Sequence, residues 1–185
     1  MGTRHLVCIY HKGRFVVAEY GHCDGYPSAA GVEVLRFLRS AGNIRQLRDN
    51  THFVRLRRSR PKDGAEVWGR QGVSILDDVA TASEPVKHFF NLEFASDGLF
   101  CEWAYVVDLD GGALEAYQGE DVYEGNECWR QNEAGRFRRA GVVQQVLRAM
   151  FAFDALPESE DDLSRLLRRR RMILSWRMSC RRWPC

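Results

Sequence analysis

Residues 4–20 read RHLVCIYHKGRFVVAEY, two runs of β-branched and aromatic residues on either side of Lys12 and Gly13. A glycine beside a polar residue between two such runs predicts a β-hairpin. Both faces of this hairpin are mostly apolar, so both must be covered by other parts of the chain. A two-residue loop at Lys12 and Gly13 predicts three cross-strand pairs: His5 with Tyr20, Val7 with Ala18, and Ile9 with Val16.

A second hairpin is predicted over residues 99–119, LFCEWAYVVDLDGGALEAYQG, because Asp110-Gly111 is a strong hairpin-turn sequence. Helices are expected over residues 29–40, 43–49 and 67–80, and a strand over residues 51–56. A last helix is expected after Ser159, because Ser159 with Asp162 three residues on resembles a capping box. Residues 142–153 fit either a strand or a helix. Together these elements predict an α+β fold with a central mixed or antiparallel sheet built on two hairpins and flanked by helices.

The length and composition predict one globular domain over residues 1–162, followed by an Arg-rich extension over residues 163–185. No stretch has the length and apolarity of a signal peptide or a membrane span, so we expect a cytoplasmic protein. The six cysteines form no CxxC pair and no metal-ligand spacing with histidine. We therefore expect free thiols, no metal site and no cofactor.

The stretch from Tyr20 to Ser28, YGHCDGYPS, joins the first hairpin to the first helix. Asp24 and Gly25 favour a tight turn, and Ser28 is a predicted helix N-cap. His22, Cys23 and Asp24 place a base, a nucleophile and a carboxylate in a row, although consecutive residues seldom point at one atom. The stretch is either a tight turn with a buried thiol or the rim of a site. The predicted ligand-binding residues at this rim are Tyr20, His22, Asp24, Tyr26, Glu102, Trp103 and Tyr105.

The segments GTRHL, VVAEYGHCDGYP, GNI and LEFASDGLFCEWAYVVDLDGGALEAYQG resemble a family of small proteins from filamentous fungi and some phages. The resemblance covers residues 2 to about 163. This family carries a YGxWDGYP motif; here Cys23 stands at the Trp position, and His22 stands where Gln is common. The resemblance implies the fold described above and leaves the chemistry open. In a filamentous fungus, a place in a biosynthetic gene cluster would suit such a protein.

Two functions from different classes remain open on the sequence. The first is a non-catalytic module that binds a small molecule or a protein partner through the rim. The second is an amide or ester hydrolase resembling the N-terminal-nucleophile class, in which Thr3 is the candidate nucleophile. Its weakness is that removal of Met1 exposes Gly2 rather than Thr3; Cys23, His22 and Asp24 are the other weak catalytic candidates.

The run Arg168, Arg169, Arg170 and Arg171 opens a basic segment with apolar residues, RRRRMILSW. Such a segment can bind nucleic acid or an anionic surface through its positive charge. The alternative interpretation is a solvated extension with no partner.

Overall fold

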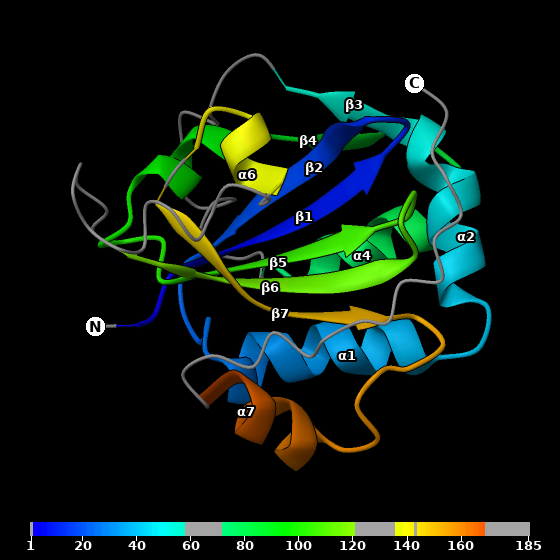
Figure 1. Cartoon of the computed structure of the whole chain (residues 1–185). Coiled ribbons are helices and arrows are strands. Elements are labelled where there is room, and N and C mark those ends of the chain that lie inside the picture. Colours follow the sequence, from blue (N-terminus) through cyan, green and yellow to red (C-terminus); the bar gives the residue numbers. More distant parts are fainter. Residues whose placement is uncertain (1, 58–71, 121–135, 143, 169–185) are drawn as a thin grey trace, which may run out of the picture.

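The computed structural model describes residues 2–57, 72–120, 136–142 and 144–168, and its centre is one five-stranded sheet (Figure 1). The strand order is β2-β1-β5-β6-β7. β1 and β5 run parallel, and the other neighbours are antiparallel. The predicted α+β fold with a mixed sheet on two hairpins is confirmed. The strands are β1 (His5–His11), β2 (Arg14–Gly21), β5 (Trp103–Asp108), β6 (Ala113–Gly119) and β7 (Gln145–Ala152).

The β1–β2 hairpin forms as predicted, but its register shifts at a β-bulge. Near the turn, Tyr10 pairs with Phe15, as a two-residue loop requires. Beyond the turn Ile9 pairs with Val17, so Val16 is an extra residue in β2. The pairs predicted for His5, Val7 and Ile9 are therefore wrong by one residue. The observed partners are Gly21 for His5, Glu19 for Val7 and Val17 for Ile9.

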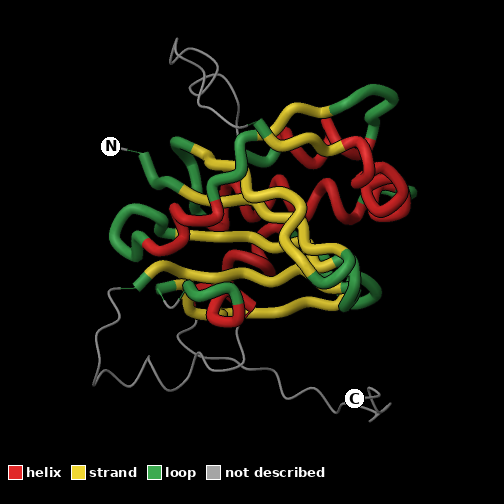
Figure 2. Tube along the Cα trace, turned by 90° about the horizontal axis from the view of Figure 1, so that it is seen from above, coloured by secondary structure: helices red, strands yellow, loops and turns green. Residues whose placement is uncertain are grey.

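Both faces of the sheet are covered, as the apolar hairpin requires; Figure 2 shows the strands side by side with helical segments around them. The larger core joins Val7, Ile9, Val17 and the odd positions of β5 to four helices. The smaller core lies on the other face around Leu6 and Phe137. The four helices are α1 (Val32–Arg39), α2 (Asn43–Asn50), α4 (Ser74–Ala80) and α7 (Glu160–Arg168); the other face carries η3 (Leu92–Ser96) and α6 (Arg136–Arg139).

Of the two helix N-caps predicted from the sequence, the one at Ser159 is confirmed and the one at Ser28 is wrong. Ser28 is not an N-cap, because it lies inside the short π-helix η1 (Pro27–Gly31), whose N-cap residue is Tyr26 in an extended conformation. Ser159 is an N-cap: its Oγ accepts a hydrogen bond from the backbone N–H of Asp162 at 3.1 Å. The Ser159 hydroxyl in turn donates to the Asp162 carboxylate at 2.8 Å, so the two side chains hold the start of the helix in a capping-box-like arrangement.

The C-terminal boundary predicted at residue 163 falls too early. α7 continues to Arg168, and both Leu163 and Leu167 are buried in the larger core. Their burial makes α7 part of the domain. The rest of the predicted extension, including Arg169, Arg170 and Arg171, lies outside the described residues.

The remaining elements are short. Thr51–Phe53 form the 3₁₀ turn η2, and the predicted strand of residues 51–56 is reduced to β3 (Val54–Leu56). β3 pairs in parallel with β4 (Val86–His88) in a separate two-stranded sheet. Residues 142–153, which fitted two interpretations, contain the strand β7.

No helix among the described residues is long and apolar enough to cross a bilayer. The three described cysteines, Cys8, Cys23 and Cys101, are all free thiols.

Candidate functional site

The corner after β2 is held from inside the core. The backbone N–H of Gly25 donates to the carbonyl of Thr3 at 2.9 Å, and the Tyr105 hydroxyl donates to the carbonyl of Gly25 at 2.9 Å. Asp24 adopts a φ of +54°, in the left-handed region that asparagine and aspartate tolerate best. These contacts fix where the chain leaves the sheet and enters η1 and α1.

The predicted rim residues separate into an outer and an inner group. Asp24 and Tyr26 are exposed, and Tyr26 keeps 52 % of its surface in solvent. Trp103 and Tyr105 are buried, at 8 % and 1 % exposure, with ring centroids 6.3 Å apart in a stacked arrangement. Burial raises the pKa of Tyr105. These two aromatic rings support the corner rather than offer a binding surface.

Three further predicted residues are half-buried: Tyr20, His22 and Glu102. The Tyr20 hydroxyl and His22 Nδ1 are hydrogen-bonded at 3.0 Å, and the Tyr20 ring packs edge-on against Phe94. The side of the corner that carries Tyr20 therefore lies against η3.

The weak catalytic candidates occupy a tightly packed region. Thr3 is 2 % exposed. Cys23 is half-buried, and a Cβ added to Gly2 would lie 2.8 Å from its Cβ. A buried hydroxyl at Thr3 has no room for a substrate carbonyl at bonding distance.

His5 is the residue at this corner that the sequence prediction missed. It is 1 % exposed, and neither of its ring nitrogens has a hydrogen-bond partner in the part of the chain that the structure describes. Three glycines enclose it: a Cβ would lie 2.1 Å from its Cε1 at Gly21, 2.8 Å from its Cβ at Gly25, and 2.9 Å from its Nε2 at Gly72. Desolvation by burial lowers the pKa of His5 to about 4, although Asp24 opposes the shift by charge attraction.

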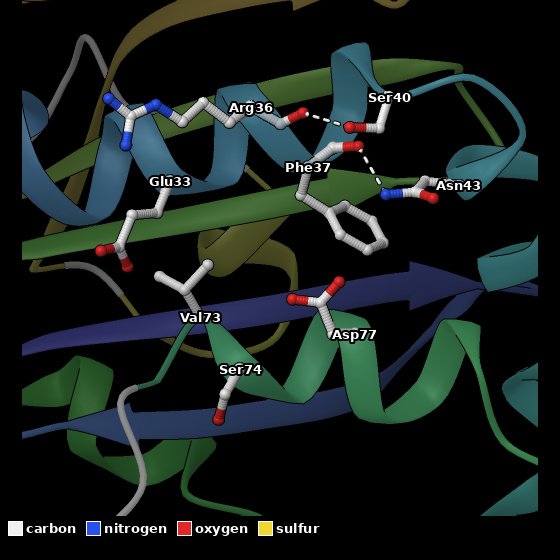
Figure 3. Close-up of a pocket in the computed structure, with 8 residues that line it drawn as sticks. All are labelled: Glu33, Arg36, Phe37, Ser40, Asn43, Val73, Ser74 and Asp77. Carbon is white, nitrogen blue, oxygen red and sulfur yellow. Dashed lines mark hydrogen bonds between the residues drawn. The ribbon is translucent and has the colours of Figure 1, made fainter.

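Two walls of an open groove start from this corner. One wall is α1, which η1 connects to the corner. The other is α4, which begins two residues after Gly72. Figure 3 shows the groove between these helices, with the Phe37 ring and Val73 between the two walls. Its volume is about 470 Å³, and its lining residues are Glu33, Arg36, Phe37, Ser40, Asn43, Val73, Ser74 and Asp77.

The groove combines an apolar floor with two carboxylates on opposite walls. Phe37 and Val73 are 6 % and 7 % exposed. Glu33 on α1 and Asp77 on α4 are exposed, and neither side chain has an ion-pair partner in the described part of the chain. Arg36, the cation at the rim, is already paired, since its Nε donates to Glu160 Oε1 at 2.6 Å. The groove therefore presents uncompensated negative charge beside an apolar surface.

A second charged cluster lies on the other face of the sheet and is internally satisfied. Arg136 Nη2 lies 2.8 Å from Glu115 Oε1 and also contacts Asp108. The Tyr117 hydroxyl donates to Glu115 at 2.7 Å, and the Arg136 guanidinium lies 4.0 Å from the centre of the Tyr10 ring. Burial alone would lower the pKa of Arg136, but the Glu115 and Asp108 carboxylates raise it. With its groups paired to one another, this cluster is a structural network.

The described residues contain no group of three or more His, Cys, Asp or Glu side chains placed to hold a metal ion. Comparison of the chain with protein-family models, with curated proteins and with solved structures finds no match.

Proposed function

We propose that this chain is a non-catalytic binding protein whose α1–α4 groove holds a small ligand with a cationic head and an apolar body. The observation that carries the proposal is a pair of carboxylates, Glu33 and Asp77, that have no ion-pair partner among the described residues. They lie on opposite walls of a groove floored by Phe37 and Val73. A volume of about 470 Å³ lies within the usual range for small-molecule sites, roughly 300–1,000 Å³.

The chemistry of the walls selects the ligand class. An ammonium or guanidinium group can donate charge-assisted hydrogen bonds to a carboxylate. The apolar floor favours an aliphatic or aromatic body, because such a body removes further apolar surface from water. A carboxylate ligand would instead meet repulsion from both walls.

The proposal moves the binding surface predicted from the sequence. Tyr105, with Trp103 stacked on it, supports the corner through Gly25, whereas the proposed ligand contacts lie on and beside α1 and α4. An accessory role, for example beside fungal biosynthetic genes, suits a binding protein of this kind. We place that role in the cytoplasm, where the free thiols of Cys8, Cys23 and Cys101 stay reduced.

The alternative, hydrolysis by an N-terminal nucleophile, has less support. Thr3 follows Gly2 in the chain and is 2 % exposed. Intact-mass measurement of the native protein tests it directly, because only a chain that begins at Thr3 has the required α-amine.

The groove is tested with phenethylammonium as the cationic probe and 3-phenylpropanoate as its anionic counterpart, by amide chemical-shift titration at pH 7.5. We expect saturable shifts in α1 and α4 with the amine only. Removing both carboxylates, with Glu33→Gln and Asp77→Asn, is expected to weaken binding about tenfold, which corresponds to about 1.4 kcal/mol for two exposed charge contacts.

Glu93→Gln is the matched control, because Glu93 is exposed on η3, over the opposite face of the sheet. It should leave the affinity unchanged. Equal binding of the anionic probe, or an unchanged affinity in the double variant, would contradict the proposal.

A further inference from the structure

His5 is in contact with the chain segments that lead into both walls of the groove. Gly25, on one side, leads through η1 into α1. Gly72, on the other side, leads into α4, and a Cβ there would also lie 3.2 Å from the backbone of Gly21. The imidazole thus fills the space in which the corner and the start of α4 meet. Movement of this ring toward Gly25 or Gly72 displaces a segment that leads into one of the two walls.

The cage around His5 suits a neutral ring better than a charged one, although the Asp24 charge and the Thr3 backbone favour the charged form to a smaller extent than burial opposes it. Glycines supply three of its sides, and within the described residues neither ring nitrogen has a hydrogen-bond partner. A protonated imidazole carries two N–H donors and a full charge, which are costly to bury without acceptors. Protonation therefore favours any conformation in which the ring reaches water.

The groups around His5 give it little compensation for a charge. Among the described residues, the Asp24 charge and the Thr3 backbone favour the protonated ring, but Asp24 is exposed at the corner and burial outweighs both. The facing position on β5 is Trp103, which is uncharged, and Gly72 has no side chain. Other titratable groups on these elements include Arg4 beside β1, His22 and Cys23 in the corner, and Tyr105 on β5; Cys8, Tyr10, His11 and Asp108 lie further along β1 and β5, and Asp77 and Asp78 lie on α4.

We propose that His5 is a pH switch of the α1–α4 groove, which we call the latch. Protonation of His5 frees Gly72 and the start of α4 from the corner, and the ligand is therefore released at acidic pH. The inference rests on the groove being the binding site. It deepens that proposal by assigning the site a regulator that does not itself line the groove.

The size of the response follows from the pKa of His5, which is about 4 in the closed protein against 6.5 for a solvated imidazole. In the open form His5 is solvated and is protonated at a higher pH than in the closed form. Opening of the groove therefore becomes more favourable as the pH falls below 6.5. Between pH 7.5 and pH 5.0 the open population is expected to rise about 30-fold.

Amide hydrogen exchange of the ligand-free protein tests the latch. The reporters are the N–H groups of Gly25, Ala30 and Leu76, bonded to Thr3, Asp24 and Val73. Their protection, corrected for intrinsic rates, should fall about 30-fold from pH 7.5 to 5.0 and should not change with low urea concentrations. Leu109, bonded to Tyr10 at the far end of β5, is the reference for global unfolding and should depend on urea.

Two variants complete the experiment. His5→Asn removes the titrating ring and should abolish the pH response of the three reporters. Gly72→Ala adds a methyl group 2.9 Å from His5 Nε2, and should lower the protection of Leu76 already at pH 7.5. Gly72→Ala keeps the test decisive if His5→Asn does not fold.

The latch is wrong if the reporters keep their protection at pH 5.0, if they share the urea dependence of Leu109, or if the response persists in His5→Asn. Phenethylammonium binding separates the two proposals. An exchange response without binding at any pH overturns the groove as a cation site and leaves the latch. Binding that stays constant from pH 7.5 to 5.0 overturns the latch alone.

Discussion

Arg136 neutralises charge in a place that water hardly reaches, and its removal gives the sharpest test of the packing on the α6 face of the sheet. Its guanidinium is bonded to Glu115 through Nε and Nη2 and to Asp108 through Nη2. The side chains of Asp108 and Glu115 are 5 % and 6 % exposed. Arg136→Met would leave both carboxylates buried without their cation.

Breaking a buried ion pair by removing one partner costs about 3–5 kcal/mol. Loss of the cation–π contact with Tyr10 adds about 0.5–1 kcal/mol. We therefore expect Arg136→Met to lower the free energy of unfolding by about 4 kcal/mol, measured by urea denaturation with Trp fluorescence at pH 7.5. Arg136→Lys should recover only part of the loss, because an ammonium cannot contact both carboxylates as a planar fork.

Two further variants decide whether the reasoning is correct. Arg139→Met alters an exposed arginine of the same helix and should change the stability by less than about 0.5 kcal/mol. Adding Glu115→Gln to Arg136→Met removes one of the stranded charges and should restore about 2 kcal/mol. If Arg136→Met lowers the free energy of unfolding by less than about 1 kcal/mol, or by no more than Arg139→Met does, Arg136 does not neutralise buried carboxylates and the reasoning is refuted.

The remaining stability predictions concern a helix cap and a buried histidine. Ser159→Ala should lower the free energy of unfolding, measured by urea denaturation, by about 1 kcal/mol, because it removes the acceptor of the Asp162 N–H. Ser28→Ala, inside η1, should leave that free energy nearly unchanged. Equal effects of the two variants would show that the cap assignment is mistaken. The pKa of His5 is lower in the folded protein, about 4, than in the unfolded chain, 6.5, so the unfolded state binds more protons in acid. The contribution of His5 to the free energy of unfolding is thus fully present above pH 6.5. Relative to His5→Asn at the same pH, about 3 kcal/mol of it should be lost as the pH falls to 4. Parallel curves of stability against pH for the two proteins would contradict this.

The fold class could be predicted because local patterns carry it. Two apolar runs around Lys12-Gly13 and two around Asp110-Gly111 specify hairpins, and apolar residues on both faces demand cover from helices. The register of the first hairpin could not be predicted. The bulge at Val16 aligns Val17 with Ile9 on the helix-covered face. That choice depends on what packs above the strand, and no residue in the turn encodes it.

The candidate site, too, could be predicted from the sequence only in part. The sequence correctly indicated that the stretch from Tyr20 to Ser28 is a corner with exposed residues, since Asp24 and Tyr26 are both exposed. It could not show that Trp103 and Tyr105 lie beneath that corner, because alternation along a strand tells which face a residue occupies and not how deeply that face is covered. The groove was also missed. Glu33 and Asp77 read as ordinary polar positions of two separate amphipathic helices.

The sequence by itself determined the hairpins, the apolar faces, the corner and the capped start of the last helix, because each follows from residues that are neighbours in the chain. Only the tertiary structure decided that β1 and β5 pair in parallel at the centre of the sheet and that Gly21, Gly25 and Gly72 close around His5. Gly72 is more than 40 positions from the other two glycines in the chain. Its contact with His5 depends on how α4 packs on the sheet, and packing is a property of the assembled core.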